Sequence, residues 1–325
     1  MEVVRPTPKD AVNDPACGTG GFLLPAYDFV GHNFELDKTQ KQTLRHKALS
    51  GTELVAGVAR LCVMNLFLHG IGGDDSPIRD GVDALAQPPS TYYEVVLTNP
   101  PFGKKSSITV VSDEGEATKE ALTYYRDDFW ATTSNKQLNF LQHVKSLLKI
   151  HGRAAIVVPD NVLFEGGAGE TVRRKILHEC DVHTLLRLPT GIFYAQGVKA
   201  NVLFFDRKSA SEKPWTTRLW IYDFRTNEHF TLKTNPLKRS DLDDFVACYH
   251  AENRHVRKET ERFKCFSYED LLKRDKVNLD IFWLKDESLE DSANLPDPDV
   301  IAAEIAEDLQ AALDQFSQIA ADLKP

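Results

Sequence analysis

The sequence has few cysteines, no long apolar run and no excess of positive charge. Its 325 residues include five cysteines, none in Cys-x-x-Cys spacing, which is typical of a reducing compartment and argues against a disulfide framework or a zinc site. No apolar stretch reaches the roughly 18 residues of a membrane helix, and the N-terminus carries no apolar signal core. We therefore expect a cytoplasmic protein with no metal site and no membrane partner.

The net charge of −9 is not spread evenly along the chain. An acidic balance argues against a protein that holds nucleic acid alone through a global positive field. The chain has 48 acidic and 39 basic side chains, and residues 281–325 alone contain 11 of the acidic and two of the basic ones. The remaining residues therefore carry 37 acidic and 37 basic side chains. The overall charge therefore does not exclude nucleic acid as a ligand.

Short apolar runs alternate with helical patterns from residue 12 to about residue 224. Runs with so little polar alternation are typical of strands buried on both faces of a mostly parallel sheet. Helical spacing of apolar residues at 55–69 and 138–148 supports a doubly wound α/β domain over residues 1–225. The clearest expected strands are 95–97, 154–159, 184–189, 201–206 and 219–224.

Three segments depart from this alternation. The polar link 207–218 is too short for a crossover helix, so we expect the strands that it joins to form an antiparallel edge pair. Residues 104–136 are rich in Ser, Thr and charge and are expected to form a long surface loop. Residues 226–325 are expected to form a C-terminal extension ending in an amphipathic helix at about 298–323, whose apolar stripe packs on its own domain or on another subunit.

A glycine-rich turn, DPACGTGGF, occupies residues 14–22. Its glycines permit a tight turn and a close approach to a ligand, and the helix N-terminus that follows favours a carboxylate or phosphate. Neither the dinucleotide pattern G-x-G-x-x-G nor a Walker loop is present. Asp14, at a strand end, can accept a hydrogen bond from an ammonium group. The candidate ligand-binding residues of this turn are Asp14, Pro15, Ala16, Gly18, Thr19, Gly20 and Gly21.

Two further acidic positions are expected at strand ends. Glu53 is suited to accept both hydroxyls of a ribose, although a glutamate at a helix start is also commonly just solvated. Asp83 is placed to accept from an adenine amino group, and Asp80 is the competing choice for that contact.

The motif NPPFG follows the expected strand at 95–97 directly. Its two prolines lack backbone N–H groups, so the turn presents mainly acceptors, the carboxamide oxygen of Asn99 and the carbonyl of Pro100. An amino group on an aromatic or amide carbon can donate to both acceptors and is thereby drawn towards a tetrahedral geometry in which its nitrogen can attack. Phe102 offers a flat face for a planar substrate. The candidate catalytic residues are Asn99, Pro100, Pro101 and Phe102.

In this order, these motifs resemble the amino-group methyltransferases of the DNA adenine-N6 class, and more closely the modification (M) subunit of type I restriction-modification systems. The resemblance covers most of residues 11–225. It rests on DPACGTGGF and NPPFG, on RLCVMNLFLHGI at 60–71, on NKQLNFLQHVKSLLKIHGRAAIVVPDNVLFEGG at 135–167, on LRLPTGIF at 186–193 and on KANVLFF at 199–205.

The resemblance implies a seven-stranded, mostly parallel sheet and S-adenosylmethionine as the cofactor. It places the methionine end of the cofactor on residues 14–21, the ribose on Glu53 and the adenine ring on Asp83. It assigns Asn99, Pro100 and Phe102 to an adenine flipped out of the duplex. It also implies double-stranded DNA, a specificity (S) subunit, a restriction (R) subunit and a second M subunit as partners, with much of the grip on DNA supplied by those subunits.

The sequence departs from the family at its start. Only 13 residues precede Asp14, and Thr7-Pro8-Lys9 is a poor match to the Phe-x-Thr-Pro-Arg-like segment that forms one wall of the family's cofactor pocket. We therefore expect a truncated chain that lacks the family's N-terminal helical domain. Two other functions stay open: an amino-group methyltransferase acting on protein glutamine or RNA, and a non-catalytic scaffold fragment.

Overall fold

The computed structural model divides the chain into two compact units, Met1–Leu284 and Lys285–Pro325. It describes residues 1–286 except 74, 104–106, 112–116, 122 and 194–196, and it describes the backbone alone for 107–111 and 117–121. The amphipathic helix expected at 298–323 lies outside the described residues. The first unit contains the glycine-rich turn, Glu53, Asp83 and the NPPFG turn.

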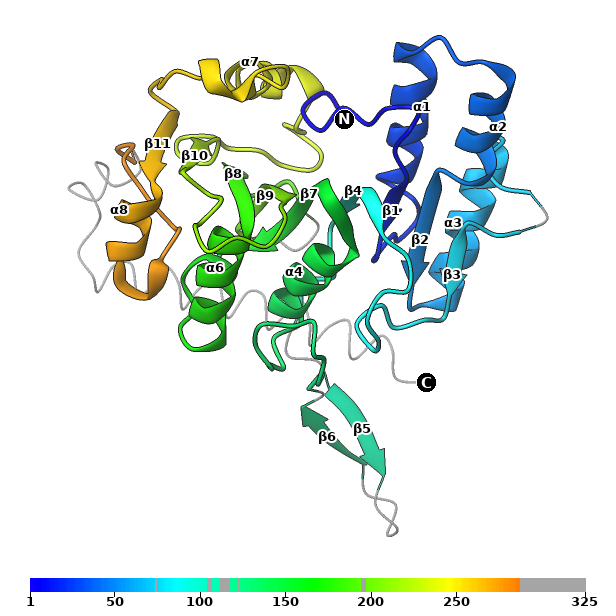
Figure 1. Cartoon of the computed structure of the whole chain (residues 1–325), viewed down its shortest axis with the longest axis horizontal. Helices are drawn as coiled ribbons and strands as arrows, with labels where there is room; N and C mark the ends of the chain where they lie inside the picture. Colours follow the sequence, from blue (N-terminus) through cyan, green and yellow to red (C-terminus); the bar gives the residue numbers. More distant parts are fainter. Residues whose placement is uncertain (74, 104–106, 112–116, 122, 194–196, 287–325) are drawn as a thin grey trace, which may run out of the picture. The chain divides into compact units, whose positions relative to one another are not determined.

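A nine-stranded sheet forms the centre of this unit (Figure 1). Seven strands run parallel to one another, and β9 and β11 run in the opposite direction. This confirms the predicted mostly parallel α/β fold. In spatial order the strands are β11 (Phe263–Ser267), β10 (Arg218–Asp223), β8 (Cys180–Arg187), β9 (Ala200–Arg207), β7 (Leu148–Pro159), β4 (Tyr93–Thr98), β1 (Val12–Asp14), β2 (Leu49–Glu53) and β3 (Ile78–Asp80).

Helices cover both faces of the sheet, as a doubly wound arrangement requires. Alternate residues of β4 show this directly, since Val95 and Leu97 belong to the apolar cluster beneath α1 and α3, and Val96 belongs to the cluster beneath α4 and α6. The helices are α1 (Leu23–Asn33), α2 (Lys38–His46), α3 (Ala56–Leu68), α4 (Lys136–Leu147), α5 (Asn161–Phe164), α6 (Ala168–Glu179), α7 (Asp243–Tyr249) and α8 (Tyr268–Lys273), with short 3₁₀ turns at Arg239–Leu242, Arg254–Val256 and Asp275–Val277.

The prediction that the strands at 201–206 and 219–224 form an antiparallel edge pair is wrong. β9 lies between β7 and β8 and runs antiparallel to both, whereas β10 pairs in parallel with the far side of β8. The reason is that β9 is apolar on both faces: Leu203 and Phe205 enter one core, and Phe204 enters the core on the other side. Such a strand gains most from a central position, and the link from 207 to 218 needs only to pass the end of β8.

The expected seven strands become nine because the sheet continues past β8. Four successive residues of β10, Leu219 to Tyr222, are buried, so this strand needs a neighbour on its outer edge. β11 supplies it by antiparallel pairing. The first compact unit accordingly extends to Leu284, beyond the domain boundary predicted at residue 225, and residues 226–284 take part in it.

The segment 104–136, expected to be a surface loop, contains regular structure. Strands β5 (Ser107–Val111) and β6 (Ala117–Ala121) pair as an antiparallel two-stranded sheet. After it, Phe129 and Trp130 pack on the core beneath α4, because a stretch of aromatic side chains gains more from burial than from solvent. Within the described residues, no helix has the length and apolar character needed to cross a membrane.

Candidate active site

The carboxyl ends of β1, β2 and β4 meet at one edge of the sheet. Asp14 is the last residue of β1 and pairs in register with Gly51, and Glu53 ends the adjacent strand β2. Asn99 follows directly on Thr98, the last residue of β4, which lies on the other side of β1. Because these strands are parallel, the structure brings the glycine-rich turn, Glu53 and the NPPFG turn to the same edge, where open α/β sheets bind ligands.

The glycine-rich turn is held in place by its neighbours. Gly18 and Gly20 have φ angles of +54° and +90°, which favour glycine. The N–H of Cys17 donates to the carbonyl of Thr52 on β2 (3.1 Å), and the side-chain amide of Asn65 on α3 donates to the carbonyl of Thr19 (3.0 Å). A Cβ added at Gly18 would meet no atom within 4 Å. The turn therefore has a fixed shape and borders open space at Gly18.

Gly51 on β2 is needed for this shape. A Cβ at this position would lie 2.8 Å from the Cβ of Cys17, 2.9 Å from its sulfur and 3.0 Å from the Cδ1 of Ile78. We expect Gly51→Ala to lower the free energy of unfolding by about 1–3 kcal/mol, the usual cost of overpacking, and to displace the turn. Chemical denaturation measures the first effect and cofactor titration the second. Gly57→Ala, on α3 with no atom within 4 Å of its added Cβ, is the matched control; equal effects of the two substitutions would contradict this role of Gly51.

Glu53 orients the turn and keeps acceptor capacity. One carboxylate oxygen accepts from the N–H of Gly18 (3.0 Å) and the other from the N–H of Val55 (2.9 Å). A carboxylate has about four lone-pair positions, so two remain for two hydroxyl donors. The residues at this position fit a ribose.

Asp14 is almost completely buried. Burial raises the pKa of this carboxyl to about 7, and the negative charge of Glu53 acts in the same direction. The Thr98 side chain and the N–H of Ala16, which donates to Asp14 at 3.0 Å, favour the ionised form and offset part of this effect. A buried carboxylate without a positive partner is costly, so a cationic ligand group beside Asp14 would be favourable.

Asp80 and Asp83 lie in different surroundings. Asp80 ends β3 opposite Glu53 and is exposed. Asp83 is half-buried, and its carboxylate accepts from the hydroxyl of Tyr124 (2.7 Å) and from the N–H of Leu85 (2.9 Å). Because these two donors orient Asp83, we keep it as the predicted contact to the cofactor adenine.

The NPPFG turn combines exposed and anchored residues. Asn99 and Pro101 are exposed, Pro100 is buried and Phe102 is half-buried. The ring of Phe102 meets that of Phe193 edge to face, with centroids 5.6 Å apart. The side-chain amide of Gln137 donates to the carbonyls of Pro101 (3.3 Å) and Gly103 (3.2 Å). An exposed carboxamide on an anchored turn is suited to hold an amino group that arrives from outside.

No individual role was predicted for Asn65, Gln137 or Phe193. All three lie within segments that carry the family resemblance, but no local pattern links them to the two turns. Their contacts join residues 34 to 91 positions apart in the chain, so only the folded structure reveals them.

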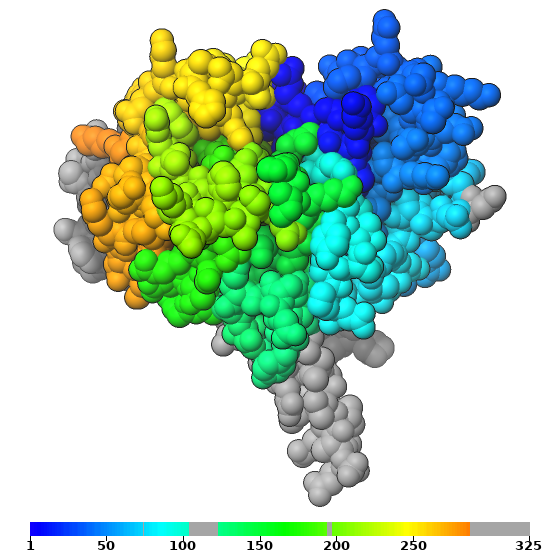
Figure 2. Space-filling view, viewed as in Figure 1, coloured from blue at the N-terminus to red at the C-terminus, as the bar shows by residue number. Residues whose placement is uncertain are grey.

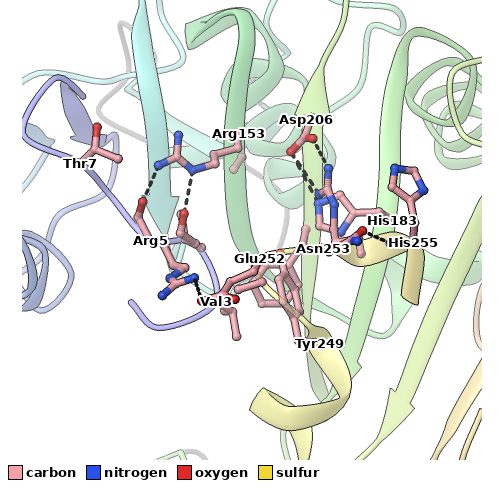
Figure 3. A pocket seen from close by; sticks show the side chains of 15 residues that line it. Val3, Arg5, Thr7, Arg153, His183, Asp206, Tyr249, Glu252, Asn253 and His255 are labelled. Atoms are coloured by element: carbon pink, nitrogen blue, oxygen red, sulfur yellow. Dashed lines mark hydrogen bonds and ion pairs between the residues drawn. The ribbon is translucent and has the colours of Figure 1, made fainter. Parts of the chain in front are cut away.

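A cavity of about 480 Å³ lies elsewhere, near the amino-terminal halves of the parallel strands β7 and β8 (Figure 3). Its charged groups are already engaged: Arg153 donates to the carbonyls of Val4 (2.7 Å) and Arg5 (2.8 Å), and Arg254 pairs with Asp206 (2.5 Å). Figure 2 shows the first residues of the chain at the surface between the α1 and α7 segments. These contacts tie the N-terminal residues to the sheet, away from the edge that carries the motifs.

Fold and site together define the class: an α/β protein of the methyltransferase type, with a glycine-rich turn, an acidic second strand end and an Asn-Pro-Pro-Phe turn on one sheet edge. Residues 1–287 match the family described as N-6 DNA Methylase, and the chain belongs to that family. The predicted family is thereby confirmed.

Nearly the whole chain is similar to methylase subunits of type I restriction enzymes. The StySJI subunit of Salmonella typhimurium is 37% identical and the EcoKI subunit of Escherichia coli 36% identical, each over 99% of this chain and 66% of the relative. The chain thus spans slightly less than two thirds of the length of these relatives. The crystal structure of the EcoKI M protein matches with a TM-score of 0.75 at 35% identity, covering 100% of this chain and 71% of that one.

Proposed function

We propose that this chain is the catalytic part of a DNA methyltransferase that modifies the N6 amino group of adenine within a type I restriction-modification complex. The observation that carries the proposal is the common sheet edge of the glycine-rich turn and the NPPFG turn, in a chain that belongs to the N-6 DNA methylase family. One turn offers a site for a methyl donor and the other a site for an amino group.

S-adenosylmethionine is the proposed cofactor, and when bound it supplies a methyl group activated by a positively charged sulfur. Asp14 would accept from the ammonium group of its methionine end, and Pro15, Ala16, Gly18, Thr19, Gly20 and Gly21 would surround that end. Glu53 would accept from the ribose hydroxyls and Asp83 from the adenine amino group. The buried carboxylate of Asp14 and the open space beside Gly18 support this assignment.

The target adenine would be held by the NPPFG turn. The Asn99 side-chain oxygen and the Pro100 carbonyl would accept the two N–H bonds of the amino group, directing its lone pair towards the methyl carbon. Pro101 would limit the backbone freedom of the turn, and the Phe102 ring would stack on the base. The base must leave the duplex because N6 lies within the stack. Positioning and fixed acceptors, rather than a strong base, would lower the barrier.

The proposed partners are double-stranded DNA, a specificity subunit, a restriction subunit and a second M subunit. The similarity to methylase subunits of type I restriction enzymes supports them. A protein 26% identical to this chain, with a TM-score of 0.72, comes from a study of complex assembly in the type I R-M system. Target choice would then depend mainly on the specificity subunit.

Labelled methyl transfer tests this function. The chain, alone and co-expressed with a candidate specificity subunit, is incubated with labelled S-adenosylmethionine and DNA, RNA or protein. We expect label in DNA as N6-methyladenine, identified by mass spectrometry of the digested nucleosides. Label confined to protein glutamine or RNA would replace the proposal by the corresponding methyltransferase, and cofactor binding without transfer to any of them would favour the scaffold.

A further inference from the structure

Gln137, near the start of α4, is hydrogen-bonded to the NPPFG turn through its side chain. Its side chain is 6% exposed, and its amide nitrogen donates to the carbonyls of both Pro101 and Gly103, at 3.3 and 3.2 Å. Pro100 and Pro101 have no N–H, so neither residue can donate a backbone hydrogen bond that would fix the turn. The turn therefore has few backbone donors of its own, and Gln137, on another element, donates to two of its carbonyls, those of Pro101 and Gly103.

The donor is itself fixed by the N-terminus of α4. The Asn135 side-chain oxygen caps this helix by accepting from the N–H groups of Gln137 (3.0 Å) and Leu138 (3.2 Å). The amide nitrogen of Asn135 donates to Glu165 (2.6 Å), and Asn161 donates to the same carboxylate oxygen (3.2 Å). These contacts tie the position of Gln137 to the segment that follows β7.

We propose that Gln137 is a positioning residue for methyl transfer: by holding two carbonyls of the NPPFG turn, it sets the orientation of Asn99 and Phe102 towards the target base. This inference rests on the proposed function. The proposed cofactor residues lie at or after the ends of β1, β2 and β3 and have hydrogen-bond partners other than Gln137. Loss of the amide should therefore slow the chemical step without weakening cofactor binding.

Gln142 provides a matched control on the same helix. It is fully buried, and its amide group also bridges backbone atoms, accepting from the N–H of Ala131 (2.8 Å) and donating to its carbonyl (3.1 Å). Gln137→Leu and Gln142→Leu thus make the same chemical change, but only the first removes donors from the NPPFG turn.

The test uses the full chain in its assembled complex. For Gln137→Leu we expect kcat for adenine methylation to fall about 10²-fold, the scale of an approximately 1 Å misplacement, with the Kd for S-adenosylmethionine within about twofold of wild type. For Gln142→Leu we expect kcat near that of wild type. A similar fall of kcat in both variants, or no fall in Gln137→Leu, would overturn the inference. As long as the wild type methylates adenine, neither outcome affects the proposed function.

Backbone ¹⁵N relaxation supplies a readout that does not depend on activity. The amide order parameters of Phe102 and Gly103 should be lower in Gln137→Leu than in wild type or in Gln142→Leu. Unchanged order parameters there would show that Gln137 does not hold the turn, and would overturn the inference whether or not the protein methylates DNA. Absence of methylation by wild type in all substrates would instead count against the proposed function.

Discussion

Asn99→Ala is expected to lower the rate of adenine methylation about 10³-fold. The exposed carboxamide of Asn99 is the side-chain acceptor that the NPPFG turn offers to the target amino group. Without it, only the Pro100 carbonyl would draw the nitrogen out of conjugation, and removal of one fixed polar partner of a transition state typically costs 10²- to 10³-fold. Single-turnover formation of N6-methyladenine by the assembled complex measures the effect.

Asn99→Asp tests whether the acceptor oxygen of Asn99 accounts for this effect. Aspartate keeps an acceptor oxygen at the same distance from the backbone, so it should retain more activity than alanine. Both variants should bind S-adenosylmethionine as wild type does, because Asn99 belongs to the turn that follows β4 and not to the glycine-rich turn. Full methylation by Asn99→Ala, or equal losses in the two variants, would remove Asn99 from its catalytic assignment.

Asp14→Asn is expected to weaken S-adenosylmethionine binding about 10²-fold at pH 8. The substitution preserves size but removes the negative charge that would pair with the ammonium group, and charged hydrogen bonds contribute roughly 1.5–3 kcal/mol. Because the pKa of Asp14 is raised to about 7, the wild-type affinity should increase as pH rises from 6 to 8, as the carboxyl loses its proton. Calorimetric titration across this range tests both statements. A pH-independent wild-type affinity, or an unaltered affinity in the variant, would contradict them.

The raised pKa of Asp14 also predicts that the free energy of unfolding decreases as pH rises, whereas the affinity for the cofactor increases. The folded pKa of Asp14, about 7, exceeds the ordinary value of 3.8, so between these values the folded protein keeps a proton that the unfolded chain has lost. The free energy of unfolding should therefore fall by up to about 4 kcal/mol from this group as pH rises from 4 to 8. Asp14→Asn should lack this penalty and be more stable than wild type at pH 8, but equal to it at pH 4. Urea denaturation at the two values provides the measurement.

The sequence predicted the strands and the two turns well because their signals are local. The apolar runs at 95–97, 154–159 and 184–189 became β4, β7 and β8, and DPACGTGGF and NPPFG became turns at the ends of β1 and β4. The place of β9 was predicted wrongly: the short polar link to β10 suggested an antiparallel edge pair, but β9 lies between β7 and β8. A short link limits the distance between two strand ends but does not exclude a third strand between them, and which strand lies there depends on the strands that compete for the same neighbours.

Some of the site therefore follows from composition and order alone. Two adjacent prolines leave the start of the NPPFG turn with mainly acceptors, and the glycines of residues 18–21 permit a backbone that few other residues tolerate. These constraints are covalent and steric, so they hold wherever the segments lie in the fold.

The tertiary structure decided which groups meet and how they are charged. It joined the glycine-rich turn to Glu53 and Asn65, placed Gln137 against carbonyls 34 and 36 residues earlier, and buried Asp14 deeply enough to raise its pKa to about 7. Burial and long-range hydrogen bonds depend on the pairing and packing of distant segments, and a local sequence pattern carries no record of those neighbours.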